Sequence, residues 1–492
     1  MTKIKEKTKL QYNQLGDTPY SVSEVGFGTY RVSSDSEDHQ VALAESIKAG
    51  INLIDTSSNY GDGDAEKLVG STLNTLISSQ LIQRDDIVVV SKGGYIQGQT
   101  YIESQKRKEN NTPIPECVEY SKGLEHCIHP DFIAEQITKS LNRLDLDHID
   151  IYLLHNPEYY LMSQKLNDIP VEDAKKEFYR RIKAAFQHLE SEVRYGRIKY
   201  YGISSNTLPN LIKSNPTEDY DRVDINELVE IAKEISKTNH FKVVQFPLNL
   251  LENNATILPI AKEHNLGVLI NRPLNAIFNE SLHRLVDFHV DDTPSSLEIE
   301  DLIQDLVQFE STVTDLNFED MGCDKAHSDE LKKSISWGQQ LSHHWNNFLG
   351  YEHWKDTLSA YFLPHIDHTL GVLADKNRLK SEDEEWFNQY LQLFNTTIQH
   401  LSAHYKSISA NRSEHIKTIL NRHIPDWCDC HTLSQKAIHG LRELDGVSSI
   451  LVGMRKEEYL NDILIEIQTP RPQKTDQNWN KLKEVIREIS KL

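Results

Sequence analysis

The chain has 492 residues, of which 38% are hydrophobic and 26% are charged, and its formal net charge at pH 7 is −21. This length exceeds that of a typical single domain and allows one large core together with a second unit. The apolar content excludes a largely disordered chain. The negative charge opposes a general attraction to nucleic acid or to an anionic membrane surface.

The start of the chain and its cysteines bear on location. Residues 1–10 are rich in lysine but lack the apolar stretch of a secretory signal, and no later run is long enough to cross a bilayer. Five cysteines without a regular spacing favour reduced thiols over a disulfide framework. We therefore expect a cytoplasmic protein without nucleic-acid or membrane partners.

Short apolar runs alternate with helical patterns along most of the chain, which is typical of parallel strands joined by crossover helices. Eight strands are predicted, at residues 25–29, 52–55, 87–91, 149–154, 200–203, 243–245, 268–270 and 449–452. Eight such units predict an α/β fold, a (β/α)8 TIM barrel. Ahead of them, Gly16-Asp17 between β-prone flanks predicts an N-terminal β-hairpin that closes the bottom of the barrel.

Two long segments interrupt the regular strand spacing. Tyr95 to Pro130 is polar and shows no periodicity, so we predict a long loop above the third strand. Residues 276–425 contain several amphipathic patterns and predict an inserted α-helical subdomain. The expected organisation is a first barrel part at 10–275, the helical insertion at 276–425, and barrel completion with C-terminal helices at 426–492.

Polar residues follow the predicted strands at the end where barrel enzymes carry their chemistry. Asp55, Lys92 and His155 each come directly after an apolar run, and Tyr60 lies five residues beyond Asp55. Singly, each also fits a structural role such as a helix cap, an ion-pair partner or a packed ring. Together they predict four side chains that converge on one barrel mouth.

These segments resemble the aldo-keto reductase family, and the resemblance extends from about residue 10 to residue 465 once the insertions are removed. The stretches that carry it are VSEVGFGT (22–29), GINLIDTSSNYG (50–61), VSK (90–92), IDIYLLH (149–155) and GISSN (202–206). The resemblance implies an NAD(P)H-dependent oxidoreductase that interconverts an aldehyde, a ketone or a sugar with its alcohol by hydride transfer.

The same resemblance implies a role for each of the four residues. Tyr60 would be the general acid and base, and Lys92 would favour the phenolate and so lower the pKa of Tyr60. Asp55 would hold Lys92 charged and in place. His155 would orient the carbonyl oxygen or help to relay the proton.

Five further residues match cofactor contacts of the family. Ser205, Asn206 and Gln245 match residues that bind the nicotinamide carboxamide. Arg272 lies in the loop that would cover the pyrophosphate, and Arg455 resembles the ligand of the adenosine 2′-phosphate. NADP(H) is therefore favoured, with NAD(H) as the alternative.

The sequence also allows a metal site and a docking role to be considered. Cys428, Cys430, His431 and His423 offer soft ligands, but the Cys-x-Cys spacing is tighter than in structural zinc sites, so we expect no metal. A role from a different class is an NADP(H)-binding redox-sensing or regulatory subunit that docks a partner protein through the helical insert. An intact set of four residues favours chemistry on a small carbonyl or sugar substrate.

Overall fold

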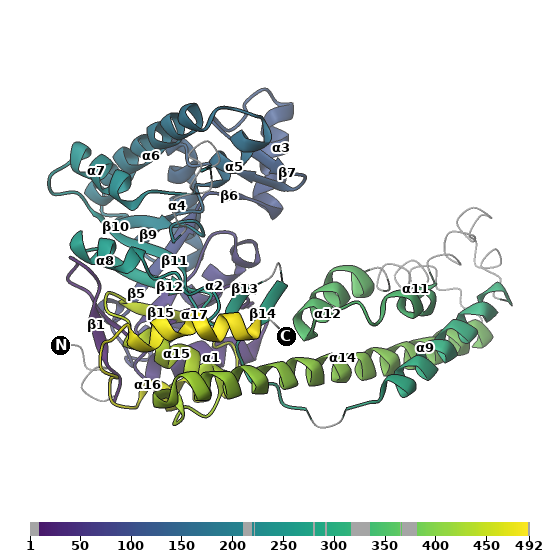
Figure 1. Ribbon diagram of the computed structural model, residues 1–492. Helices are drawn as coiled ribbons and strands as arrows, with labels where there is room; N and C mark the ends of the chain where they lie inside the picture. The colour runs from purple at the N-terminus through teal and green to yellow at the C-terminus, as the bar shows by residue number, and fades with distance from the viewer. Residues whose placement is uncertain are drawn as a thin grey trace. The chain divides into compact units, whose positions relative to one another are not determined.

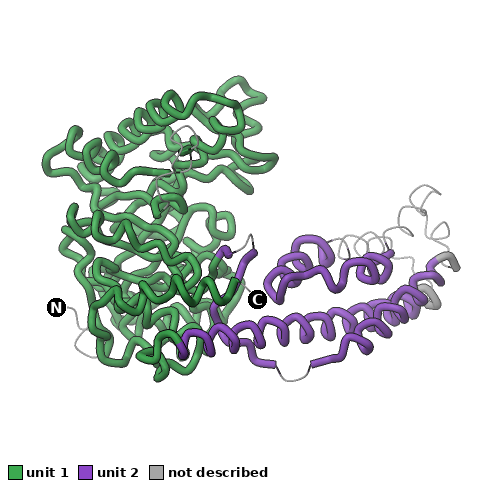
Figure 2. Tube along the Cα trace, in the orientation of Figure 1, with its two compact units in different colours: residues 1–276, 423–491 green, residues 277–422, 492 purple. Residues whose placement is uncertain are grey.

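A computed structural model describes residues 9–209, 219–220, 222–278, 281–290, 293–315, 335–364, 366 and 381–490 of the protein. The chain divides into two compact units (Figure 2). The first comprises residues 1–276 and 423–491, and the second comprises residues 277–422 with residue 492.

The first unit contains a closed barrel of eight parallel strands (Figure 1). Around the barrel the hydrogen-bonded order is β10-β11-β12-β15-β3-β4-β5-β9. The strands are β3 (Val25–Gly28), β4 (Leu53–Asp55), β5 (Val88–Gly93), β9 (Ile149–His155), β10 (Ile198–Ser204), β11 (Phe241–Pro247), β12 (Gly267–Asn271) and β15 (Ser449–Val452). The predicted barrel is confirmed.

Apolar side chains fill the barrel interior, and the N-terminal hairpin closes one end. Strands β1 (Tyr12–Gln14) and β2 (Ser21–Ser23) pair antiparallel. Leu15 and Val22 of this hairpin join the same core as Val90, Ile151 and Leu269. The turn needs glycine at residue 16, because its φ is +54° and an added Cβ would lie 2.2 Å from the backbone nitrogen of residue 267.

Helices follow the strands and cover the outside of the barrel, as crossover connections require. They are α1 (Glu37–Lys48), α2 (Asp64–Ser78), α4 (Pro130–Leu144), α5 (Tyr159–Leu166), α6 (Val171–Arg194), α7 (Ile225–Ile235), α8 (Ile257–Glu263), α15 (Leu433–Glu443), α16 (Glu457–Ile467) and α17 (Gln477–Ile489). Short 3-10 turns are η1 (Tyr60–Gly63), η2 (Arg84–Asp86) and η6 (Pro425–Trp427). In α6, for example, Phe178, Ile182 and Leu189 share the buried face.

The segment predicted as a long loop is folded, so that prediction was wrong. It forms β6 (Tyr95–Ile96), α3 (Gly98–Glu109), β7 (Val118–Ser121) and β8 (Leu124–His126), with the strands in the antiparallel order β6-β8-β7. Helix α3 buries only Ser104, so it has no apolar stripe to detect. Its side chains pair instead with charged residues of α4, as in Lys139–Glu103 at 2.6 Å.

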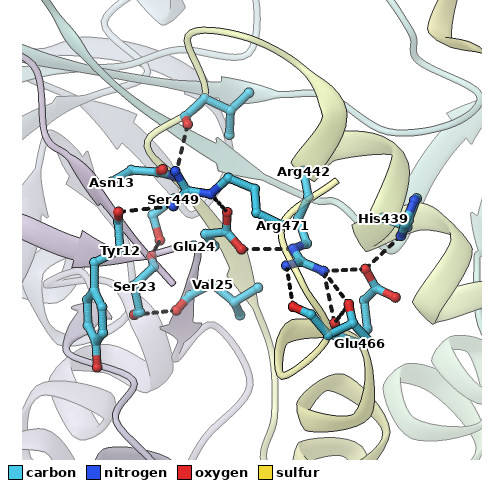
Figure 3. A network of polar contacts seen from close by, with 12 residues as sticks. Tyr12, Asn13, Ser23, Glu24, Val25, His439, Arg442, Ser449, Glu466 and Arg471 are labelled. Atoms are coloured by element: carbon cyan, nitrogen blue, oxygen red, sulfur yellow. Dashed lines mark hydrogen bonds and ion pairs between the residues drawn. The ribbon is translucent and has the colours of Figure 1, made fainter. Parts of the chain in front are cut away.

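Buried ion pairs tie the last part of the barrel to its first strand (Figure 3). Arg442 of α15 is fully buried and donates to Glu24, just before β3, at 2.9 Å and to Glu466 of α16 at 2.6 Å. Arg471 donates to the other oxygen of Glu24 at 2.7 Å. The two contacts with Glu24 join residues that lie more than 400 positions apart, so they close the barrel across the insertion.

The second unit is helical and has its own core, which confirms the predicted helical insertion. Its helices are α9 (Ser296–Ser311), η4 (Thr312–Asp315), α11 (Trp337–His344), α12 (Tyr351–Thr357), the π-helical turn η5 (Leu358–Phe362) and α14 (Ser381–His423). A small sheet of β13 (Asn275–Phe278) and β14 (Ser281–Arg284) lies near its start. Leu306, Leu341, Trp354 and Phe394 belong to one buried cluster. No helix within the described ranges is both long and apolar enough to span a membrane.

Candidate active site

Three of the predicted catalytic residues lie on neighbouring strands. Asp55 is the last residue of β4, Lys92 lies one residue before the end of β5, and His155 ends β9. Strand β5 pairs with both β4 and β9 in parallel, so these side chains share the carboxyl-terminal edge of the barrel. Tyr60 is the first residue of η1, which is the next element after β4. The fold thus brings the four residues together.

Lys92 is the centre of this group. Its Nζ atom lies 2.7 Å from Oδ2 of Asp55 and 3.3 Å from the hydroxyl of Tyr60. It also donates to the carbonyl oxygen of Thr56 at 2.9 Å. The other carboxylate oxygen of Asp55 accepts from the side-chain amide of Gln245 at 2.7 Å. The lysine and aspartate side chains are 0% and 5% exposed, so this is a buried and hydrogen-bonded ion pair.

Burial is the largest cause of the pKa shifts of Asp55, Lys92 and Tyr60. It raises the pKa of Asp55 and lowers that of Lys92, each against the attraction of the partner charge. Burial and the nearby carboxylate of Asp55 raise the pKa of Tyr60 well above its ordinary value. The expectation that Lys92 favours the phenolate of Tyr60 stays a prediction, because burial and the charge of Asp55 are the largest causes of the pKa shift in this structure. Tyr60 stays protonated at neutral pH and can donate a proton.

His155 presents a neutral ring to the same site. The ring centroids of His155 and Tyr60 are 6.0 Å apart. Burial, with the positive charge of Lys92 and the ring of His126 as further causes, holds the pKa of His155 well below its ordinary value. Its Nδ1 atom lies 3.1 Å from Oγ of Ser57. Its Nε2 atom has no hydrogen-bond partner within the part of the chain that the structure describes, so it is available to a substrate oxygen.

Aromatic rings that the sequence analysis missed stand beside these residues. Tyr30, 66% exposed, packs edge-on against Tyr60 at 5.1 Å between centroids. Tyr95 packs against His155 at 4.8 Å and against Tyr159 at 5.3 Å. The sequence held a signal for Tyr95, because this residue lies three positions after Lys92 and close to the end of the third predicted strand. These rings can contact the apolar part of a bound substrate.

Two of the predicted carboxamide ligands lie close to Asp55. Gln245 contacts it directly, and the backbone nitrogen of Ser205 donates to the carbonyl oxygen of Gln245 at 2.9 Å. Asn206 follows Ser205 with an exposed side chain. The turn after β10 and the end of β11 thus place amide and hydroxyl groups beside the four residues.

The two predicted arginine contacts differ in their surroundings. Arg272 follows β12 and pairs with Glu252 at 2.7 Å, so its guanidinium already has an acidic partner. Arg455 is half-buried just ahead of α16. Its charge and that of Lys456 help burial to lower the pKa of His39 in the first turn of α1. His39, which the sequence analysis missed, therefore lies near Arg455 and Lys456.

The cysteine and histidine residues near the C-terminal helices form a hydrogen-bonded group. Ligand atoms of Cys430, His439 and Glu466 lie within 4.8 Å of one another. Glu466 accepts from Arg442 at 2.6 Å and from Cys430 at 3.6 Å, and it lies 2.9 Å from Nδ1 of His439. His423 lies elsewhere, against Glu488 at 2.9 Å. Protein partners account for each of these groups.

Comparison with known proteins identifies the family. The chain is 28% identical over 269 residues to an uncharacterized oxidoreductase, YqkF, of Bacillus subtilis, which covers 54% of this chain and 69% of that protein. It is 31% identical to L-galactose dehydrogenase of Arabidopsis thaliana, over 33% of this chain and 43% of that enzyme. It is 30% identical to the NADH-specific methylglyoxal reductase of Escherichia coli, over 29% of this chain and 40% of that enzyme.

Two of these three alignments thus span less than half of the relative's length. A family model, by contrast, matches more than half of this chain. Residues 24–280 match the model of the aldo/keto reductase family. The protein therefore belongs to this family of NAD(P)H-dependent oxidoreductases.

Proposed function

We propose that the protein interconverts an aldehyde, a ketone or a sugar with the corresponding alcohol, with NADP(H) as its preferred cofactor. The observation that supports this most is the position of Lys92, which contacts both the carboxylate of Asp55 and the hydroxyl of Tyr60 in a buried site. A protonated phenol beside a fixed positive charge is a suitable proton donor for a carbonyl oxygen.

The proposed reaction needs one proton from the protein. NADPH, when bound, supplies a hydride to the carbonyl carbon. Tyr60 gives its hydroxyl proton to the carbonyl oxygen, so that the C=O bond becomes a C–OH group. His155 orients that oxygen through its ring, and Asp55 and Lys92 hold the phenol in place. In the direction of alcohol oxidation, the phenolate of Tyr60 takes the proton back.

The surroundings fit such a cofactor. The exposed amide of Asn206 would bind the nicotinamide carboxamide directly, whereas the hydroxyl of Ser205 and the amide of Gln245 would exchange their present partners for it. We also propose that Arg272 binds a pyrophosphate oxygen of the cofactor. Its guanidinium would then leave Glu252, its present partner.

The preference for NADP(H) rests on Arg455. This guanidinium lies next to Lys456 and directly ahead of α16, where a phosphate group would find positive charge and a helix start. NAD(H) stays the alternative, because one relative is NADH-specific by name.

Titration of the purified protein with NADPH and with NADH, followed by protein fluorescence, tests the proposal. A panel of aldehydes, ketones and sugars is then added to the protein with the bound nucleotide. We expect binding and turnover, with NADPH bound more tightly. Binding without turnover would favour the alternative of a redox-sensing subunit that docks a partner through its helical insert. No binding of either nucleotide would contradict the proposal.

A further inference from the structure

A buried carboxylate contacts the turn that is proposed to bind nicotinamide. Glu158 follows His155 by three residues and is only 1% exposed. Its Oε1 atom accepts a hydrogen bond from the backbone nitrogen of Asn206 at 2.8 Å. The side chain of Ser205 and the backbone nitrogen of Thr207 lie near enough to this carboxyl group to oppose the rise of its pKa. Its Oε2 atom is buried and has no partner in the described part of the chain.

The turn that Glu158 contacts is short and leaves β10 directly. The backbone nitrogen of Ser205 bonds to Gln245 on the neighbouring strand. The backbone nitrogen of Thr207 bonds to Oγ of Ser205 at 3.2 Å. One end of the turn is thus fixed by the barrel, whereas the nitrogen of Asn206 is held by Glu158. Buried N–H groups need such an acceptor, and a charged acceptor binds them more strongly than a neutral one.

We propose that Glu158 is a positioning residue for the turn formed by Ser205, Asn206 and Thr207, and that its ionised carboxylate holds this turn in the conformation that binds nicotinamide. The inference rests on the proposed function, because it assigns the turn to the cofactor. Glu158 acts through the turn and does not touch the reacting atoms. Protonation of the carboxylate weakens its hydrogen bonding to the turn, so nucleotide affinity depends on pH.

The side chain of Glu158 changes its charge near neutral pH. Burial raises its pKa to about 7, although the hydrogen bonds from the turn oppose this shift. The titratable groups that face it are the phenols of Tyr95 and Tyr159, whose pKa values are raised. Because His155 stays neutral as well, only Glu158 in this group changes charge between pH 6 and 8. The carboxylate form therefore prevails at pH 8 and the neutral acid at pH 6.

The test is the dissociation constant of NADH at pH 6, 7 and 8 for the full-length protein and for Glu158→Gln. NADH is the probe because it lacks a 2′-phosphate, whose own titration falls in this range. We expect the affinity of the unchanged protein to fall about fivefold from pH 8 to pH 6, the scale for replacing charge-assisted by neutral hydrogen bonds. Glu158→Gln should bind about as weakly at every pH as the unchanged protein binds at pH 6.

A matched control is Glu172→Gln, which changes an exposed glutamate at the start of α6 and should keep the pH dependence. A second measurement needs no variant. In the unchanged, deuterated protein, the backbone ¹⁵N–¹H resonance of Asn206 should shift with pH along a single titration near pH 7.

The outcomes separate the two claims. If NADH and NADPH both fail to bind at any pH, the proposed function is wrong. If they bind but Glu158→Gln keeps the affinity and pH profile of the unchanged protein, Glu158 does not position the turn. An Asn206 resonance that does not move between pH 6 and 8 would overturn the inference as well, even if the variant fails to fold.

Discussion

Replacement of Asp55 by Asn should destabilise the barrel by an amount that depends on pH. Among the residues that the structure describes, Asp55 is the only acidic residue that contacts the buried Lys92, which in the variant would keep Thr56 and Tyr60 as neutral partners. Removing one member of a buried ion pair costs about 3–5 kcal/mol. The alternative for the variant is to fold with a neutral lysine, which costs about 5 kcal/mol at pH 7 but only about 2 kcal/mol at pH 9.

The sign of this dependence follows from proton binding. Lys92 is neutral in the folded variant and charged in the unfolded chain, so the unfolded chain binds one proton more below the ordinary pKa of lysine. Stability then rises with pH by about 1–3 kcal/mol between pH 7 and pH 9, from a loss of about 3–5 kcal/mol to one of about 2 kcal/mol. The unchanged protein should show a smaller rise, because the charge of Asp55 opposes the lowering of the pKa of Lys92.

Urea unfolding combined with hydrogen exchange of peptides from β4 and β5 reports on the barrel alone. Asp173→Asn, an exposed aspartate of α6, is the matched control. The double variant Asp55→Asn with Lys92→Met should lose less stability than the sum of the single losses, because it leaves no buried charge unpaired. A loss for Asp55→Asn that is the same at pH 7 and pH 9 would refute the reasoning.

Two further predictions concern arginines. Arg455→Ala should weaken NADPH binding at least about tenfold and leave NADH nearly unchanged, because the lost group is a charged phosphate donor; equal losses in fluorescence titrations would remove Arg455 from the 2′-phosphate site. Arg442→Met should cost the barrel about 3–5 kcal/mol in urea unfolding, since Glu24 and Glu466 lose a buried cation. The exposed Arg194→Met is its control, and a loss no larger than that of the control would contradict a closing role for this network.

The strands could be predicted because each is an apolar run buried on both faces. In β9, for instance, all seven residues from Ile149 to His155 are buried. The same pattern predicted the place of Asp55, Lys92 and His155, since a polar residue directly after such a run stands at the barrel mouth. The contacts of Lys92 with Asp55 and Tyr60 were implied only by the family resemblance and not by the pattern, because side-chain contacts across strands depend on register.

The segment between β5 and α4 could not be predicted in this way. Helix α3 is held by charged pairs such as Arg107–Glu135, which leave no periodic signal in the sequence. The ring of Tyr95 therefore went unnoticed as a neighbour of His155. That burial and the carboxylate of Asp55 raise the pKa of Tyr60 could not be predicted, because the degree of burial is not visible in a sequence.

The most direct test of the central claim is the rate of carbonyl reduction by Tyr60→Phe. The variant keeps the ring that packs against Tyr30 and removes only the hydroxyl group near Lys92. If Tyr60 donates the proton, nucleotide affinity is retained and reduction is slowed at least about a hundredfold relative to the unchanged protein. Reduction at the rate of the unchanged protein would contradict the account and remove Tyr60 from the mechanism.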